Sequence, residues 1–252
     1  MDNIRIAESF TLPSKGLLYE DVNPEIVMSS MKTKHEMLRL SATEDSQKIM
    51  SEIIDDCLVN DIGISAYDLC LGDFQYLLYK LRIITFGPDY TMESVCPYCG
   101  FESTFSVNLD DLEVHEFDES LVNLFELTLP SSGDVVTLRY QTPRLLDQLN
   151  RKVKDYRKRH KNTNENATVL YAICTSIDKI NGEDPGFAIE QIVKDMDLAD
   201  ATAIINRIDE INNAVGVDLD IVDNCKLCGS GFHFPFRINN TFFRPNITAR
   251  KL

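Results

Sequence analysis

The chain has 252 residues, of which 44% are apolar and 26% are charged, a composition typical of folded proteins and not of disordered ones. Its net charge of −15 argues against general nucleic-acid binding, which depends on neutralising phosphates. No apolar run reaches the roughly 20 residues of a membrane helix, because Lys80 and Arg82 interrupt the most apolar stretch.

The N-terminal segment lacks the basic flank and apolar core of a secretory signal, so we expect a cytoplasmic protein with reduced thiols. Pro13, Gly16 and Pro24 separate a few large apolar residues there. Residues 1–30 are therefore predicted to be an extended arm that lies on its own domain or on a partner.

Residues 31–90 are predicted to form a helical part of the body. Apolar residues recur with a helical period from about Thr43 to Asn60. A second helix is expected to begin at Asp73, which can cap it, and to end at Gly87 followed by Pro88.

Residues 91–142 are predicted to hold a first zinc knuckle and a β region. Apolar residues alternate after Cys99, which is typical of a strand. The stretch LFELTLPSSGDVVTLRYQTP alternates on both sides of a Ser-Ser-Gly-Asp turn at 131–134 and is predicted to form a hairpin.

Residues 143–216 are predicted to form a second helical part, opened by a cap and first-turn proline at Thr142 and Pro143. Residues 217–238 are expected to hold a second knuckle with its strand, and 239–252 a C-terminal tail. The predicted class is α+β, a mostly helical body with a small β-hairpin region and a split zinc ribbon whose ligands are four cysteines. The further helices are expected at Thr168 to Ser176, Ala188 to Asp195, and Asp197 or Asp200 to Val215, with a turn at 178–186.

Two cysteine pairs indicate a metal site. Cys96 and Cys99 in CPYCG, and Cys225 and Cys228 in CKLCG, are each followed by a glycine that allows a positive φ. A strand-like stretch follows each pair: Phe232, Phe234 and Phe236 alternate after the second. We expect the knuckles to face each other, with their strands paired, around one structural Zn²⁺, since four thiolates leave no position for water.

Three other interpretations of the cysteine pairs remain open. Disulfides are disfavoured in a reducing compartment, and a thioredoxin-type redox site is disfavoured by the duplicated knuckle glycines. The cysteines could also bind no metal. The remaining cysteines, Cys57, Cys70 and Cys174, have apolar neighbours and are expected to be buried.

No catalytic motif was found among the metalloprotease, hydrolase, phosphate-binding and dinucleotide-binding patterns. The four histidines are scattered along the chain. We therefore predict a protein that is not an enzyme and has no small-molecule substrate.

The uneven charge favours docking on a protein surface. Residues 144–161 hold eight of the 25 basic residues, while 109–120 form an acidic block. For either block taken alone, a solvated helix face is the favoured explanation. The arm 10–30, the C-terminal tail and the basic helix are candidate contacts, with the individual residues Arg151, Lys152, Lys154, Arg157, Lys158, Phe242 and Phe243. Adjacent exposed phenylalanines would be a liability, so Phe242 and Phe243 are expected to be buried somewhere.

Taken together, these landmarks resemble the baseplate hub and hub-assembly proteins of T-even-type contractile-tailed bacteriophages. The shared features, over about residues 10–246, are LPSKG at 12–16, LCLGDFQYLLYKLRIITFG at 69–87, CPxCG at 96–100, the second knuckle, and FFRP at 242–245. The basic helix has no counterpart in this pattern.

The resemblance implies a viral protein that helps to build the central hub of the tail baseplate through contacts with other tail proteins. It would act in the host cytoplasm during assembly and could remain in the tail of the virion. The alternatives are a zinc-ribbon factor that binds nucleic acid or acts in transcription, which the charge of −15 disfavours, and an enzyme of unrecognised type.

Overall fold

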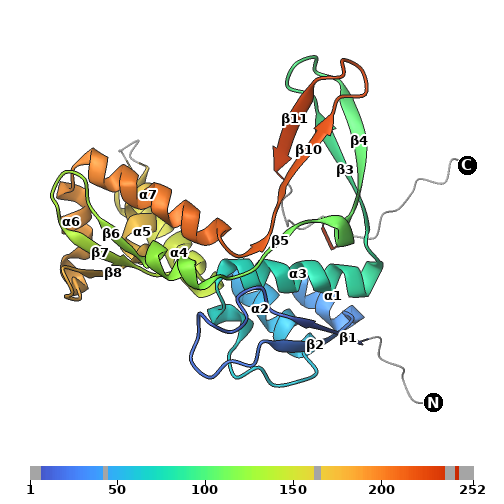
Figure 1. The fold of residues 1–252 in the computed structure, drawn as a ribbon, viewed down its shortest axis with the longest axis horizontal. Helices are drawn as coiled ribbons and strands as arrows, with labels where there is room; N and C mark the ends of the chain where they lie inside the picture. The colour runs from blue at the N-terminus through green and yellow to red at the C-terminus, as the bar shows by residue number, and fades with distance from the viewer. Residues whose placement is uncertain (1–6, 42–44, 162–165, 236–241, 244–252) are drawn as a thin grey trace, which may run out of the picture.

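The computed structural model describes residues 7–41, 45–161, 166–235 and 242–243. They form three parts in Figure 1: an N-terminal body (residues 7–88), a ribbon that projects from it (89–108 and 220–235) and a helical lobe (119–213). Helices and several small antiparallel sheets occur together, which confirms the predicted α+β class.

The N-terminal body is built around helix α3 (Leu71–Phe86), most of whose side chains are buried. Strand β1 (Ala7–Thr11) pairs antiparallel with β2 (Glu25–Ser29), and Leu12 between them is 1% exposed. From residue 7 onward the predicted arm thus packs on its own domain. The other elements here are α1 (Thr33–Arg39), α2 (Ser46–Cys57) and the 3-10 helix η1 (Ala66–Asp68).

The prediction that Asp73 caps this central helix is wrong. The cap position of α3 is Cys70, three residues earlier, and its sulfur accepts the backbone N–H of Asp73 at 3.5 Å. The Asp73 carboxylate is instead fully buried, and it accepts the backbone N–H of Ser14 at 3.0 Å and the hydroxyl of Tyr19 at 2.6 Å. Contacts between distant segments therefore decide the role of this side chain, and they fasten the LPSKG segment to α3.

The helical lobe contains the predicted hairpin of β6 (Glu126–Thr128) and β7 (Val135–Leu138). Strand β8 (Ile177–Ile180) pairs with β7 at a position where the sequence predicted a turn. The predicted helices are present with shifted ends. They are α4 (Pro143–Arg159), α5 (Ala167–Ser176), α6 (Ile189–Asp195) and α7 (Leu198–Asn213), and the 3-10 helices are η3 (Glu119–Phe125) and η4 (Gly186–Ala188).

The ribbon consists of two hairpins. Strand β3 (Asp89–Val95) pairs with β4 (Glu102–Asn108), and β10 (Asp220–Asn224) pairs with β11 (Gly231–Pro235). Each strand after a knuckle thus pairs with the strand before that knuckle, so the prediction that the strands after the two knuckles pair with each other is wrong among the described residues. The reason is that each knuckle reverses the chain. Phe236 lies outside the described residues.

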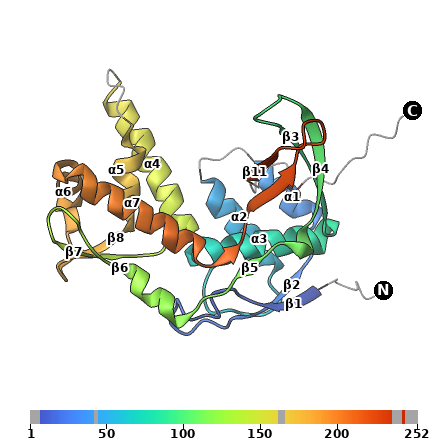
Figure 2. The ribbon, with the colours of Figure 1, turned by 45° about the horizontal axis from the view of Figure 1, so that its top comes forward.

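The helical lobe is inserted between the two halves of the ribbon. The chain enters and leaves it side by side, because β5 (Val114–His115), which follows the 3-10 helix η2 (Leu109–Asp111), pairs with β9 (Gly216–Val217). Gly72 lies directly against this exit: a Cβ there would be 2.0 Å from the carbonyl oxygen of Val215. Helix α3 separates the other parts, since the lobe joins it near Gly72 and the ribbon begins beyond its other end (Figures 1 and 2).

Candidate metal centre

The first knuckle is the turn of the β3–β4 hairpin. The backbone N–H of Cys96 donates to the carbonyl of Phe101 at 3.0 Å, and the N–H of Gly100 donates to the carbonyl of Cys96 at 2.9 Å. Gly100 has φ 71°, a left-handed conformation that a side chain would disfavour. The glycine therefore allows the tight reversal that turns both sulfurs to one side.

The second knuckle repeats this geometry at the tip of β10–β11. The backbone N–H of Cys225 donates to the carbonyl of Ser230 at 2.9 Å, and that of Gly229 donates to the carbonyl of Cys225 at 2.8 Å. Gly229 has φ 73°, within a few degrees of its counterpart. The two CxxCG segments thus share one backbone conformation as well as one sequence pattern.

The structure brings all four predicted ligands together at the tip of the ribbon. The sulfur of Cys96 lies 3.8 Å from that of Cys228, the sulfur of Cys99 lies 3.6 Å from that of Cys225, and all four lie within 4.8 Å of one another. A tetrahedral site with Zn–S bonds of about 2.3 Å places its sulfurs about 3.8 Å apart. The arrangement therefore fits one metal ion bound by four cysteines.

The two hairpins of the ribbon share a very small apolar core. Cys96 and Cys225 are 2% and 3% exposed, while the other two cysteines are exposed. Between the hairpins, the rings of Phe105 and Phe232 meet edge to face with their centroids 6.0 Å apart. So few apolar groups do not normally hold two hairpins together without a metal or a disulfide.

The thiols differ in acidity. Hydrogen bonds from Ser230 lower the pKa of Cys228 to about 6, and backbone N–H groups, first that of Cys228, lower the pKa of Cys225. The N–H of Phe101 lowers the pKa of Cys99, but desolvation and the adjacent thiols outweigh it and raise that pKa to about 12. Several thiolates at this spacing repel one another, so the site favours a cation among them.

A disulfide does not describe this geometry. None of the seven cysteines forms a disulfide, and the sulfur pairs between the knuckles, at 3.6 and 3.8 Å, lie well beyond the roughly 2.05 Å of an S–S bond. The isolated cysteines Cys57, Cys70 and Cys174 are buried, as predicted, and burial raises the pKa of each.

One constellation outside the ribbon has the residue types of a catalytic triad. His35 Nδ1 lies 3.5 Å from the sulfur of Cys57, and its Nε2 lies 2.6 Å from Asp56 Oδ2. However, Nδ1 already accepts the backbone N–H of Lys32 at 3.0 Å, and Cys57 is 0% exposed with its pKa raised by burial to about 12. Both ring nitrogens of His35 therefore have hydrogen-bond partners in a structural role, and the thiol of Cys57 is not activated as a nucleophile.

The predicted contact residues divide into two groups. The basic residues Arg151, Lys152, Lys154, Arg157 and Lys158 are exposed on α4. Phe242 and Phe243 are 0% and 2% exposed and pack in the core of the N-terminal body, where Arg82 donates to the carbonyl of Phe242 at 2.9 Å. Their predicted burial is confirmed, and because their own chain covers them they offer no surface to a partner. Most of the tail, 244–252 included, lies outside the described residues.

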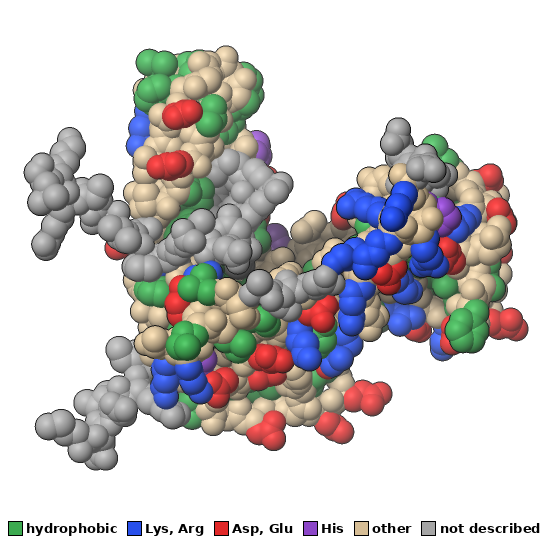
Figure 3. Space-filling model, turned by 180° about the vertical axis from the view of Figure 1, so that it is seen from behind, with side chains coloured by type: hydrophobic (Ala, Val, Ile, Leu, Met, Phe, Trp, Pro, Cys, Tyr) green, Lys and Arg blue, Asp and Glu red, His purple; other side chains and the backbone are tan. Residues whose placement is uncertain are grey.

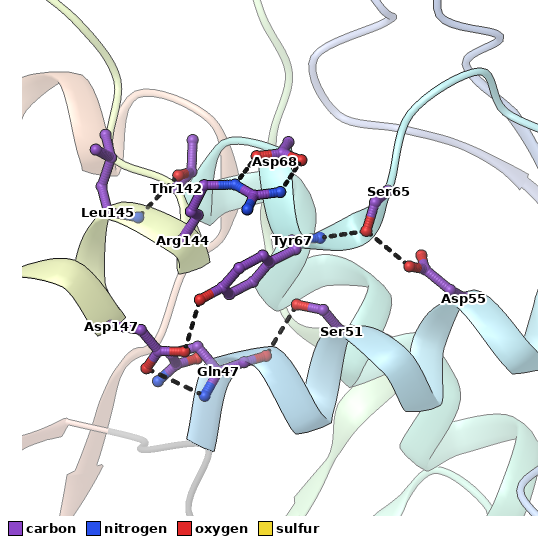
Figure 4. Close-up of polar contacts among 10 residues, drawn as sticks. All are labelled: Gln47, Ser51, Asp55, Ser65, Tyr67, Asp68, Thr142, Arg144, Leu145 and Asp147. Atoms are coloured by element: carbon purple, nitrogen blue, oxygen red, sulfur yellow. Dashed lines mark hydrogen bonds and ion pairs between the residues drawn. The ribbon is translucent and has the colours of Figure 1, made fainter. Parts of the chain in front are cut away.

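A polar junction between α2 and α4 was not predicted (Figure 4). Asp147 is 0% exposed, accepts the backbone N–H of Lys48 at 2.9 Å and the hydroxyl of Tyr67 at 3.1 Å, and so satisfies the start of α2. Arg144 forms a bidentate pair with Asp68 beside it, at 2.5 and 2.7 Å. The one hint in the sequence is an acidic residue in the early turns of a strongly basic helix.

Within the described part of the chain, no helix is long and apolar enough to cross a membrane. The model of a protein family described as T4 bacteriophage base plate protein matches residues 7–244. No curated protein and no solved structure matches the chain.

Proposed function

The chain belongs to the T4 bacteriophage base plate protein family, and from this membership we propose that it is a non-enzymatic structural or assembly protein of the baseplate hub. The observation that carries the proposal is the extent of the match, which covers residues 7–244 and so includes the body, the lobe and both knuckles. Its work would be done by contacts with other tail proteins, in the host cytoplasm during assembly or in the tail of the virion.

The contacts of the shared segments support a scaffold. The backbone N–H of Ser14 in the LPSKG segment donates a hydrogen bond to Asp73 in the 69–87 segment. Arg82, also in the 69–87 segment, donates one to the carbonyl of Phe242 in the FFRP segment. These segments therefore build the core of the N-terminal body.

For the cysteine cluster we propose a structural Zn²⁺ held by Cys96, Cys99, Cys225 and Cys228. The sulfur spacing and the lowered pKa of Cys228 support it, and a set of four thiolates favours zinc over metals that prefer oxygen ligands. Zinc would fix the two hairpins, and with them the two ends of the inserted helical lobe. A rigid ribbon would then project from the body as a contact element.

The basic face of α4 supports a second candidate, a zinc-ribbon nucleic-acid-binding factor. The ribbon itself adds little to it: the amine of Lys226 is directed to the carbonyl of Thr104, 2.8 Å away. The two functions are separated by the partner that binds. A nucleic-acid-binding factor would bind a duplex of any sequence, with an affinity that falls steeply with salt, whereas a tail-assembly protein would bind other tail proteins.

The proposed role is tested by loss of the gene from the phage. We expect cells infected with a phage carrying an early stop codon to accumulate tail components without complete baseplates. Supplying the protein from a plasmid should restore infectious particles, which is the matched control. Normal numbers of infectious tails made without the protein would overturn the proposal.

A further inference from the structure

Helix α4 gives an otherwise acidic molecule one strongly basic face. Figure 3 shows Lys and Arg side chains gathered over this part of the helical lobe. The exposed basic residues of the segment are Arg144, Arg151, Lys152, Lys154, Arg157, Lys158, Arg159 and Lys161. Since the whole chain carries a net charge of −15, this face differs in sign from the molecule around it.

The same face is hollowed. Leu149 and Val153 form the floor of an open hollow with a volume of about 600 Å³, and Lys154, Arg157 and Lys158 are among the residues that line it. The two floor residues are 8% and 7% exposed, so most of their surface packs against the lobe and a little remains at the bottom of the hollow. An apolar floor with a cationic rim is a surface that matches amphipathic chains.

Part of the positive charge is not neutralised by the chain itself. Arg151 contacts the half-buried Asp45 at 3.7 Å, which is long for an ion pair. Lys158 pairs with Asp155 at 3.5 Å at an exposed position, where ion pairs contribute little. Within the described ranges, no ion pair involves Arg157 or Lys161. The rim therefore retains cationic groups that a partner can engage.

We propose that this hollow docks an acidic amphipathic segment of another tail protein, with an apolar side chain over Leu149 and Val153 and carboxylates on Arg157 and its neighbours. Charge complementarity favours an acidic occupant, because the basic face attracts anions. The apolar floor favours a peptide over nucleic acid, because a peptide can place an apolar side chain there and a phosphate backbone cannot. The net charge of −15 opposes a long polyanion, whereas a protein can present a short acidic patch. The inference rests on the proposed role in tail assembly.

The test measures binding of the purified full-length protein, by calorimetry, to each purified tail protein encoded beside it, and to a DNA duplex of about 20 base pairs. The variants are Arg157→Glu alone and together with Lys158→Glu. The control is Lys179→Glu, at an exposed position of β8 outside the hollow, because it changes the net charge by the same amount as the single variant. Metal content and melting temperature are recorded for each variant.

We expect wild-type protein to bind one tail protein, with an affinity that falls when salt rises from about 0.1 M to about 1 M, as the Debye length shrinks from about 10 Å to about 3 Å. The double variant should bind about tenfold more weakly or worse, and Lys179→Glu within about twofold of wild type. Should a variant lose metal or melt early, Arg157→Gln provides the same comparison with a milder change.

Each other outcome has a separate meaning. Equal binding by wild type and the double variant would overturn the inference and leave the proposed function standing. DNA binding that the α4 variants abolish, with tail-protein binding unaffected, would replace the acidic segment by nucleic acid as the occupant. Failure of wild type to bind any tail protein would overturn the proposed function itself.

Discussion

The sulfur atoms of Cys99 and Cys225 lie 3.6 Å apart although 126 positions separate them in the chain. Most of the intervening residues form the helical lobe, whose chain leaves the ribbon after β4 and returns to it before β10. Because loop-closure entropy grows only slowly with loop length, such an insertion is tolerated when strong contacts hold its ends. The cysteine cluster provides those contacts together with the β5–β9 pair.

Removing one ligand should release the metal and loosen the ribbon without unfolding the body. We expect Cys225→Ser to reduce bound zinc from one per chain to nearly none, because a site with three thiolates has lost much of the roughly 10–16 kcal/mol of a structural zinc site. Amide hydrogens of β10 and β11 should exchange faster, while those of α3 stay protected by their own core. Elemental analysis and hydrogen exchange measure both effects.

The control is Cys174→Ala, which removes a buried cysteine of the helical lobe outside the cluster. It should keep full zinc content and lose about 1 kcal/mol of stability from the small cavity. Zinc retained by Cys225→Ser would show that the sulfur of Cys225 is not a ligand.

Gly72→Ala should destabilise the protein although alanine is the better helix former by about 1 kcal/mol. The added Cβ would lie 2.0 Å from the carbonyl oxygen of Val215, so α3 and the lobe must move apart. We expect a loss of about 3 kcal/mol in the free energy of unfolding, measured by urea denaturation.

The matched control is Gly182→Ala, at φ +83° with no atom within 4 Å of the new Cβ. It has backbone strain without a clash and should cost about 1 kcal/mol. If Gly72→Ala were as stable as wild type, the close approach of α3 and the lobe exit would be incorrect.

Asp147→Ala should loosen the junction of α2 and α4 seen in Figure 4. It leaves the hydroxyl of Tyr67 and the backbone N–H of Lys48 without their acceptor, and buried donors without acceptors cost about 1–3 kcal/mol. We expect a loss of about 3 kcal/mol by urea denaturation. Asp155→Ala, an exposed acid on the same helix, should change stability by less than about 0.5 kcal/mol. Similar losses for both variants would contradict the capping role.

Stability should depend on Asp200 only above acidic pH. Although desolvation raises its pKa, the backbone N–H groups of Ser131 and Ser132 donate to its carboxylate at 2.7 and 3.1 Å and lower the pKa overall. A carboxyl group with a lowered pKa stabilises the fold above its unfolded pKa of about 3.9, and this contribution is lost as pH falls through the folded pKa.

Asp200→Asn should therefore melt at a lower temperature than wild type at pH 7, and the difference should shrink below about pH 4. Asp209→Asn, at an exposed position of the same helix, should track wild type across the range. Melting curves by circular dichroism at stepped pH provide the measurement. A difference between Asp200→Asn and wild type that does not change with pH would contradict the assignment.

Local patterns in the sequence predicted much of this fold. The period of apolar residues predicted α2 and α4 to α7, and the Thr142 cap predicted where α4 begins. The Ser-Ser-Gly-Asp turn predicted the β6–β7 hairpin. The repeated CxxCG located the metal site, since the cysteine spacing and the glycine are both local requirements of the knuckle.

The remaining features depend on distant partners and could not be predicted locally. Asp73 has the sequence signal of a helix cap, but Ser14 and Tyr19 reach it from the arm and bury it. Strand β3 was missed because it pairs only after the knuckle reverses the chain. Asp147 caps a helix a hundred positions away, and no periodicity in the sequence indicates such a partner.

The X-ray absorption spectrum of the native protein at the zinc edge tests the central claim most directly. Four Zn–S distances of about 2.3 Å, with no shorter oxygen or nitrogen shell and one zinc per chain, are the result we predict. An absent zinc signal, or a shell of oxygen and nitrogen ligands, would contradict a metal held by both knuckles.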